Sequence, residues 1–240
     1  MKKFIISALL MITSVFVLAS CSIFNDEKVK EETVSIHKDQ AKKLDVSLDL
    51  GAGVMNVSKG TKNWVDGRIE YNNKYFNPDV SYKLKDSTGE VRIDQSKKHF
   101  PKVKIGKLKN EWNLKLSNKV PIDLDVNTGA SKTNLDLRGL NLNDLEIEAG
   151  VGELNVNLGG SWNKSFEANI ETGVGKTTIV LPSDVGVKIN LSKGIGKVNV
   201  VDLISKGNGV YVNEAYEKAN VKLTINVDLG VGEVNFKVDK

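Results

Sequence analysis

The sequence predicts an all-β fold: a single-domain, β-helix-like solenoid in which short strands stack and are joined by Gly-x-Gly turns. The first observation behind this prediction is an internal repeat. Six similar segments occur along the chain, at 44–59, 122–137, 145–158, 166–181, 187–203 and 223–238. The second observation is composition, because 21 glycines, only 4 prolines and frequent Val, Ile, Leu and Asn favour strands and tight turns over helices.

The N-terminal segment has the features of a secretory signal. Positive charges at 2–3 precede an almost wholly apolar stretch at 4–17. At roughly 15 residues this stretch is shorter than the ~20 that a membrane-spanning helix needs, so we expect residues 1–20 to be removed as a signal peptide. The stretch ends in Leu18-Ala19-Ser20-Cys21, which resembles the bacterial lipobox. We therefore expect lipid on Cys21 to hold the mature chain at the extracytoplasmic face of the cell membrane.

Charge and thiol content exclude several classes of protein. Removing residues 1–20 deletes two lysines and lowers the formal charge from +4 to about +2, which leaves no strongly basic footprint for nucleic acid. With a single cysteine, no intramolecular disulfide can form. Residues 21–43 are charged and poor in apolar side chains, so we expect a lipidated N-terminus followed by a flexible tether.

The repeat domain is predicted to span 44–240, with an irregular N-terminal part at 44–120 and regular repeats at 121–240. In the regular part, the leading glycines of successive turns are separated by 21, 23, 21 and 36 residues, and the last gap holds an insertion of about 15. A period near 21 is typical of a solenoid, whose units share one core by stacking. A sharp bend calls for positive φ, which glycine adopts without steric cost. The predicted turn glycines are Gly51, Gly53, Gly129, Gly150, Gly152, Gly173, Gly175, Gly194, Gly196, Gly230 and Gly232.

Apolar and polar residues alternate on both sides of each turn, as in 145–158. This period of two is the strand signal, and it places Val156 and Ile189 in the shared core, with Asn155 and Lys188 facing outward. The asparagines of the polar face either stack into side-chain ladders or are simply solvated.

Units such as DLEIEAGVGELNVNLGG at 144–160, together with the lipobox and the polar tether, resemble the toast-rack lipoproteins of low-GC Gram-positive bacteria. The repeat is also similar to the extracytoplasmic domain of cell-wall-active-antibiotics-response (LiaF-like) proteins. The resemblance covers about 44–240, and its motifs are structural turns without catalytic groups. It therefore implies the toast-rack fold and an envelope binding, sensing or structural role. The LiaF-like arrangement has several membrane helices where this chain has a lipid-anchor signal, a departure that leaves a direct regulatory role open.

No catalytic motif emerges, so we expect no enzyme, no cofactor and no metal site. The segment GVGKTT at 173–178 resembles the end of a phosphate-binding P-loop, but that motif needs a glycine where Ile170 stands and a helix where residues 177–181 favour a strand. Two histidines, His37 and His99, are too few for a zinc site or a nucleophile-base pair. A polysaccharide-active β-helix enzyme stays open as the least favoured alternative. Its candidate carboxylates are Glu146, Glu148, Glu153 and Glu171.

Two segments interrupt the repeat. The aromatic segment, 64–82, suits either sugar stacking or capping of the solenoid end, and capping is the favoured interpretation. Its aromatic residues are Trp64, Tyr71, Tyr75, Phe76 and Tyr82. The basic segment, 95–110, has no acidic residue, which suits teichoic-acid phosphates or anionic headgroups, although a solvated strand edge is the simpler interpretation. Its candidate polyanion contacts are Lys97, Lys98, Lys102, Lys104, Lys107 and Lys109.

Together these observations predict a membrane-anchored, extracytoplasmic module of the cell envelope that is not catalytic. It would bind, sense or have a structural role, and a part in the envelope-stress response would fit the resemblance. An adhesin-like surface protein is the main alternative. The expected partners are the membrane, through the lipid on Cys21, and an envelope protein or anionic wall polymer, with no nucleic acid and no nucleotide.

Overall fold

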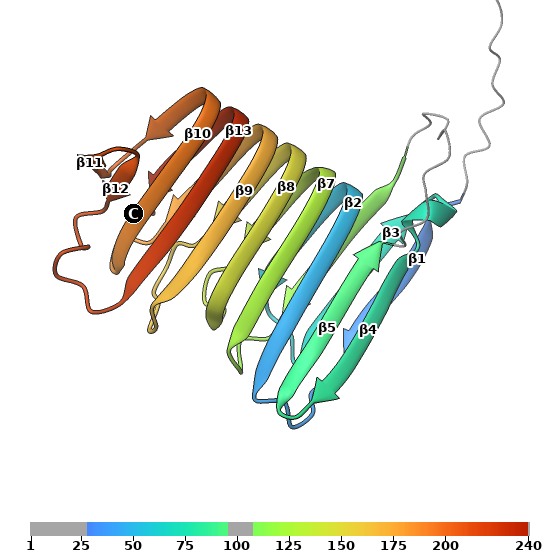
Figure 1. Cartoon of the computed structure of the whole chain (residues 1–240). Coiled ribbons are helices and arrows are strands. Elements are labelled where there is room, and N and C mark those ends of the chain that lie inside the picture. The colour runs from blue at the N-terminus through green and yellow to red at the C-terminus, as the bar shows by residue number, and fades with distance from the viewer. Residues whose placement is uncertain (1–27, 96–107, 240) are drawn as a thin grey trace, which may run out of the picture.

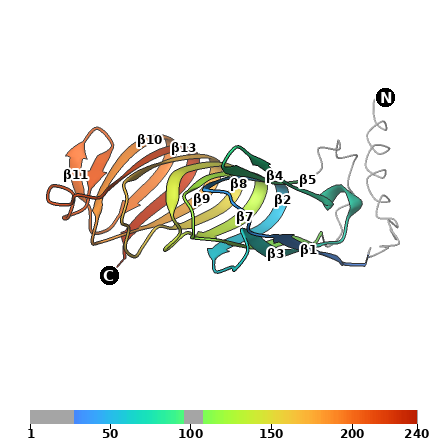
Figure 2. The ribbon, with the colours of Figure 1, turned by 90° about the horizontal axis from the view of Figure 1, so that it is seen from below.

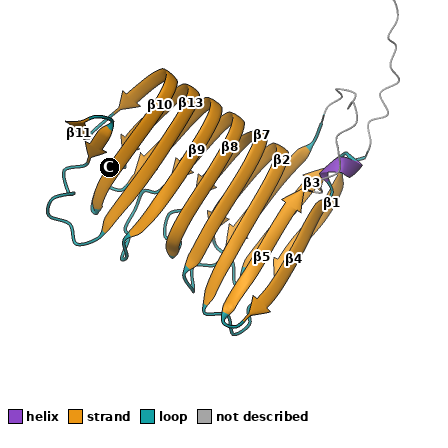
Figure 3. Ribbon diagram, viewed as in Figure 1, coloured by secondary structure: helices purple, strands orange, loops and turns teal. Residues whose placement is uncertain are grey.

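The computed structural model describes residues 28–95 and 108–239, and its framework is one 13-stranded sheet. Figure 1 shows the strands as a row of curved ribbons. The main path of the sheet is β1-β3-β6-β2-β7-β8-β9-β13-β10-β12-β11, with β5 paired to β2 and β4 to β5. In these described ranges the helical structure is a single 3-10 turn (Figure 3), and no helix is long and apolar enough to cross a membrane. The prediction of an all-β solenoid is confirmed.

Six long strands form the rungs of the row. They are β2 (Lys43–Lys59), β7 (Ile122–Asp136), β8 (Leu142–Asn157), β9 (Phe166–Leu181), β10 (Gly186–Val200) and β13 (Lys222–Val238). Neighbouring rungs are parallel and aligned turn on turn. Each rung corresponds to one predicted repeat. Where the sequence predicted two short strands and a turn, the structure has one strand of 15–17 residues that curves back on itself.

The core lies between the two halves of every rung. In β8, Ile147 before the bend and Leu154 after it are both buried, although they are seven positions apart and strict alternation would place them on opposite faces. The Gly-x-Gly bend absorbs the change of phase by turning its middle residue outward, and Val151 is 56% exposed as a result. Val156 and Ile189 are buried as predicted.

Where a bend has two glycines, as in β8, the two have different functions. Gly152 has φ of +138°, a conformation that favours glycine. Gly150 does not have a positive φ, but a Cβ there would lie 2.7 Å from the carbonyl oxygen of Gly129 on the neighbouring rung. Positive φ therefore explains the second glycine only. The first is required because the backbones of adjacent rungs approach closely.

The order of the rungs in space differs from their order in the sequence. β13 comes last in the chain but lies between β9 and β10, in register with both. The insertion between β10 and β13 contains β11 (Ile204–Gly207) and β12 (Val210–Val212), and β12 pairs antiparallel with the first half of β10. The chain thus skips one position after β9 and returns later to fill it (Figure 1).

At the other end, both halves of the first rung are covered. β5 pairs with Lys43–Asp49 of β2, and β6 pairs with Val54–Lys59. The covering elements are β1 (Lys30–Ile36), β3 (Val65–Tyr71), the 3-10 turn Lys74–Phe76, β4 (Pro78–Lys85), β5 (Thr88–Gln95) and β6 (Asn110–Leu116). These elements form a cap of the kind that solenoids need, and they lie at the end of the row farthest from β10 (Figure 2).

The tether predicted for 21–43 is wrong from Lys30 onward. β1 pairs antiparallel with β3 along its whole length and buries Val34 and Ile36. Charged residues at 30–32 occupy the more exposed positions of this strand, so composition alone suggested a solvated tether. Residues 1–27, with the predicted signal peptide, lie outside the described residues.

Candidate interaction surfaces

The aromatic segment packs into the N-terminal cap. Trp64, Tyr71 and Phe76 are buried, and Tyr75 and Tyr82 are half-buried. Side chains that already fill the space under the cap have little face left for stacking on a sugar ring. Burial therefore supports the capping interpretation of this segment.

Asp39 accepts three hydrogen bonds that connect segments of the N-terminal cap. Its carboxylate accepts from Trp64 Nε1 at 3.0 Å, from Tyr82 Oη at 2.7 Å and from the backbone N of Ala41 at 3.0 Å. The bond from Ala41, followed by those from Tyr82 and Trp64, lowers the pKa of Asp39 although partial burial opposes the shift. Burial, together with the hydrogen bond and charge of Asp39, raises the pKa of Tyr82 to about 12. Both groups keep their ordinary protonation states at neutral pH, which suits a structural junction.

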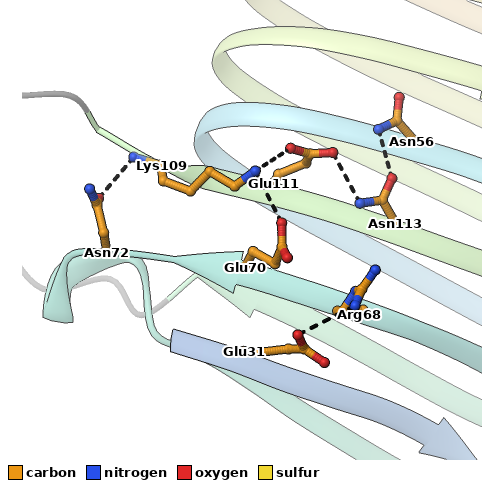
Figure 4. Close-up of polar contacts among 8 residues, drawn as sticks. All are labelled: Glu31, Asn56, Arg68, Glu70, Asn72, Lys109, Glu111 and Asn113. Atoms are coloured by element: carbon orange, nitrogen blue, oxygen red, sulfur yellow. Dashed lines mark hydrogen bonds and ion pairs between the residues drawn. The ribbon is translucent and has the colours of Figure 1, made fainter. Parts of the chain in front are cut away.

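Lys109, a candidate polyanion contact, is held in place by two carboxylates (Figure 4). Its Nζ lies 2.7 Å from Glu111 Oε2 and 3.0 Å from Glu70 Oε2, and its backbone N donates to Asn72 Oδ1 at 2.8 Å. Hydrogen bonds to Glu111 and then to Glu70 raise the pKa of Lys109. These two neighbours compensate its charge, which disfavours the predicted contact between Lys109 and a polyanion. The sequence did not reveal this because Glu70 is brought in by the pairing of β3 with β6.

The predicted lipidation site and the other predicted polyanion contacts fall outside the described residues. Cys21 and Lys97, Lys98, Lys102, Lys104 and Lys107 all belong to these parts of the chain. Their roles in lipidation and polyanion binding stay predictions.

The outer positions before the bend align into a strongly acidic face, of which the sequence predicted only a few carboxylates. Parallel pairing brings carboxylates of successive rungs together, because equivalent positions of adjacent strands lie about 4.8 Å apart. The acidic residues that precede the bends of these rungs are Asp45, Asp49, Asp123, Asp125, Asp144, Glu146, Glu148, Glu167, Glu171 and Asp228. Aligning the repeats by their glycines would have predicted the face.

The crowding of carboxylates changes their acidity. Burial first, and then the charges of Glu148, Asp45 and Asp49, raise the pKa of Asp125. The pKa of Asp144 is raised in the same way, by burial and by repulsion from its neighbours. At neutral pH, the ionised carboxylates of the acidic face therefore lower the free energy of unfolding.

A shallow groove of about 540 Å³ runs between this face and the bends. Glycines of five rungs lie along it, together with the carboxylates of Asp49, Glu148, Glu171 and Asp228. These four carboxylates come from rungs that are adjacent or separated by one rung, so they form a row and do not converge on one point. In the described residues, no group of three His, Cys, Asp or Glu side chains is arranged to hold a metal ion.

After the bend, the outer face carries two further ladders. The first alternates in charge from rung to rung, in the order Lys132, Glu153, Lys176, Glu233 and Lys197. Lys132 Nζ lies 3.3 Å from Glu153 Oε2. The second is an asparagine ladder on neighbouring strands, joined by amide hydrogen bonds of 2.8–3.0 Å. Its members are Asn113 of β6 in the cap, followed by Asn56, Asn134 and Asn155 in three consecutive rungs. Of the two interpretations left open by the sequence, the structure supports the asparagine ladder.

The carboxylates considered for polysaccharide cleavage are divided by the bend. Glu146, Glu148 and Glu171 lie on the acidic face, whereas Glu153 lies in the alternating ladder. The segment at 173–178 lies within β9 and does not precede a helix, so it lacks the geometry of a P-loop. The described side chains form long rows rather than a convergent catalytic site.

Comparisons with known proteins agree on the architecture. The profile of the N-terminal domain of toast_rack matches residues 25–180, and that of the C-terminal domain of the cell wall-active antibiotics response protein LiaF matches 130–236. The crystal structure of a proposed cell adhesion protein from Clostridium sporogenes ATCC 15579 is 32% identical, with a TM-score of 0.86, over 88% of this chain and 100% of that chain. A proposed adhesin from Bacteroides fragilis NCTC 9343 is 13% identical over 88% of this chain and 97% of that chain, but its TM-score of 0.28 is too low for any inference. No curated protein matches the chain.

Proposed function

The chain belongs to the toast-rack family, and from this membership we propose that it is a lipid-anchored, non-catalytic binding module at the outer face of a bacterial membrane. The observation that carries the proposal is the alignment of equivalent outer positions into continuous ladders of carboxylate, ammonium and amide groups. A repetitive, extended surface suits a polymer or another protein, whereas a small substrate needs a concave site that encloses it.

The two kinds of relative favour different versions of this role. Similarity to the LiaF C-terminal domain favours a part in the response to cell-wall-active antibiotics. The structure from Clostridium sporogenes, a proposed cell adhesion protein, favours an adhesive role. Crosslinking of the lipidated protein in intact cells separates them. A sensing role requires a membrane protein of the same cell among the crosslinked species, whereas an adhesive role requires retention of the purified chain on wall or host-surface material.

Anchoring is tested at Cys21. Replacing Cys21 by Ala removes the thiol that would accept the diacylglyceryl group, so the variant should stay unprocessed and lack lipid in a metabolic labelling experiment. Two acyl chains give stable attachment where one gives marginal binding, since each buried CH₂ contributes ~0.8 kcal/mol. Labelled, mature-size protein from the variant would contradict the lipobox assignment.

Polyanion binding is tested in the basic segment. Changing Lys97, Lys98, Lys102 and Lys104 together to Gln should weaken binding to teichoic acid or anionic vesicles while the fold is retained. For the wild type, binding should fall as salt rises from about 0.05 to 0.3 M, because the Debye length shortens from roughly 14 to 6 Å. The matched control changes Lys176 and Lys197, which lie among carboxylates in the alternating ladder. Equal, salt-insensitive binding by all three proteins would exclude this segment.

A further inference from the structure

The two ends of the solenoid are finished differently. At the N-terminal end, β5 and β6 cover both halves of the first rung. At the C-terminal end, β12 covers only the first half of β10, through pairs at Lys188–Asn190 and a bond from Leu191 N to Gly209 O of 2.9 Å. Within the described residues, no strand pairs with the far side of the second half of β10. We call the stretch Ile195–Val200 the open edge (Figure 1).

The open edge leaves core positions uncovered. Val198 and Val200 are only partly buried, whereas Val234 and Phe236, their register partners in β13, are 0% exposed. Ile195 is 77% exposed, the largest value among the exposed large apolar side chains of the described residues. An edge that combines free backbone hydrogen-bonding groups with exposed apolar side chains is a template for another strand.

Charge on β10 defines which strand would fit. The strand holds Lys188, Lys193 and Lys197 and no acidic residue. Lys197 is also the last member of the alternating ladder, following Glu233 of β13. Continuing the alternation by one rung places an acidic side chain opposite Lys197, because opposite charges in adjacent strands attract and like charges repel.

The same charges disfavour a second copy of this chain. Two open edges paired with each other would bring lysines together with no carboxylate on either strand to compensate them. Lys193 has the register position of Leu229 in β13 but is exposed, and its Nζ donates to Gly196 O at 3.4 Å. A lysine on an edge strand is a known means of preventing self-pairing. The open edge therefore disfavours pairing with a second copy of itself and favours a strand that has an acidic side chain opposite Lys197.

We propose that the open edge of β10 binds an extended segment of a partner protein by strand addition, with an acidic side chain opposite Lys197 and apolar side chains opposite Val198 and Val200. The bound segment completes the missing half of the last rung. This inference deepens the proposed function by naming a surface and the chemistry of a partner, and it rests on that proposal only in taking the domain to be a binding module.

The probe is a blocked synthetic peptide copying residues 229–237, because this sequence already pairs with the opposite side of β10 and places Glu233 beside Lys197. Titrated against the full-length chain in detergent, it should bind saturably and slow amide hydrogen exchange at Ile195–Val200. A peptide N-methylated at alternate residues cannot form the strand hydrogen bonds and should not bind. Lack of saturable binding up to about 1 mM, or equal binding by the methylated peptide, would overturn the proposal.

A charge exchange tests the acidic requirement. Lys197→Glu should weaken binding of the probe about tenfold and restore it for a peptide with Lys in place of Glu233. The matched control is Lys176→Glu, at the same register position in β9, where strands pair on both sides and no effect is expected. Binding unchanged by Lys197→Glu would overturn the assignment, as would self-association of the chain through this edge in sedimentation experiments. The assay does not depend on lipidation, so failure at Cys21 and failure at the open edge are separate results.

Discussion

Two buried threonines in β7 differ in their hydrogen bonding, and the difference predicts opposite effects of the same substitution. Thr128 is 7% exposed, and its Oγ1 has no hydrogen-bond partner among the described residues. Thr133 Oγ1 lies 2.9 Å from Ser131 Oγ. Because an unpaired buried hydroxyl is costly, Thr128→Val should raise the free energy of unfolding by about 1 kcal/mol, and Thr133→Val should lower it by a similar amount. Urea unfolding of both variants gives the comparison, and stabilisation by both would contradict it.

The acidic face predicts a pH effect at Asp125. Its pKa is raised in the folded state, so its contribution to stability is present below the unfolded pKa of about 3.9 and is lost as pH rises through the folded pKa. Asp125→Asn should therefore increase stability at pH 7, by about 0.2–1 kcal/mol, and the gain should vanish near pH 3. Thermal unfolding between pH 3 and 7 measures this.

Asp136 supplies a control of opposite sign. Hydrogen bonds from the Arg138 side chain, at 2.7 Å, lower the pKa of Asp136, so its contribution is present above the unfolded pKa and is lost as pH falls. Asp136→Asn should be destabilising at pH 7 and neutral in acid. If stability depended on pH in the same way for both variants, neighbouring charges would not control the pKa values of Asp125 and Asp136.

At the scale of a single rung, Gly152 combines positive φ with a close approach. A Cβ there would lie 1.9 Å from the carbonyl oxygen of Ser131, whereas Gly60, with φ of +130°, has no atom within 4 Å of an added Cβ. Gly60→Ala tests backbone strain alone and should cost about 1–3 kcal/mol. Gly152→Ala should cost more, because the neighbouring rung must also move. If both substitutions lowered the free energy of unfolding equally in chemical denaturation, the close approach of the neighbouring rung would add nothing to the cost at Gly152.

Local pattern predicted the rungs well because each one contains its own signal. The period of two identified the inward residues Val156 and Ile189, and the repeated glycines located every bend. The cap was less predictable, since its strands are held by partners distant in sequence. β1 has a charged exposed face, and only its pairing with β3 shows that Val34 and Ile36 are core residues. The ion pairs of Lys109 could not be predicted from the sequence for the same reason, because the pairing of β3 with β6 brings Glu70 to Lys109.

At the scale of the whole molecule, the position of a rung is set by pairing and not by its place in the chain. Nothing in the period of the glycines distinguishes a final strand that extends the row from one that fills a gap. β13 fills the gap, so the rung synthesised last is interior, and β10 is the exposed end. A consequence is that β10 has no rung to pair with along its length until residues 222–238 have been made.

This order predicts an asymmetry between two equivalent valines. Val234 in β13 and Val198 in β10 are register partners, but Val234 is 0% exposed and Val198 is only partly buried. An unpaired buried charge costs several kcal/mol against a total stability of about 5–15 kcal/mol, so Val234→Asp should unfold or loosen the domain. Val198→Asp should cost much less, because its carboxylate can reach water at the open edge. If the rungs were stacked in sequence order, β13 would be the terminal rung, and the two substitutions would rank the other way in a denaturation experiment.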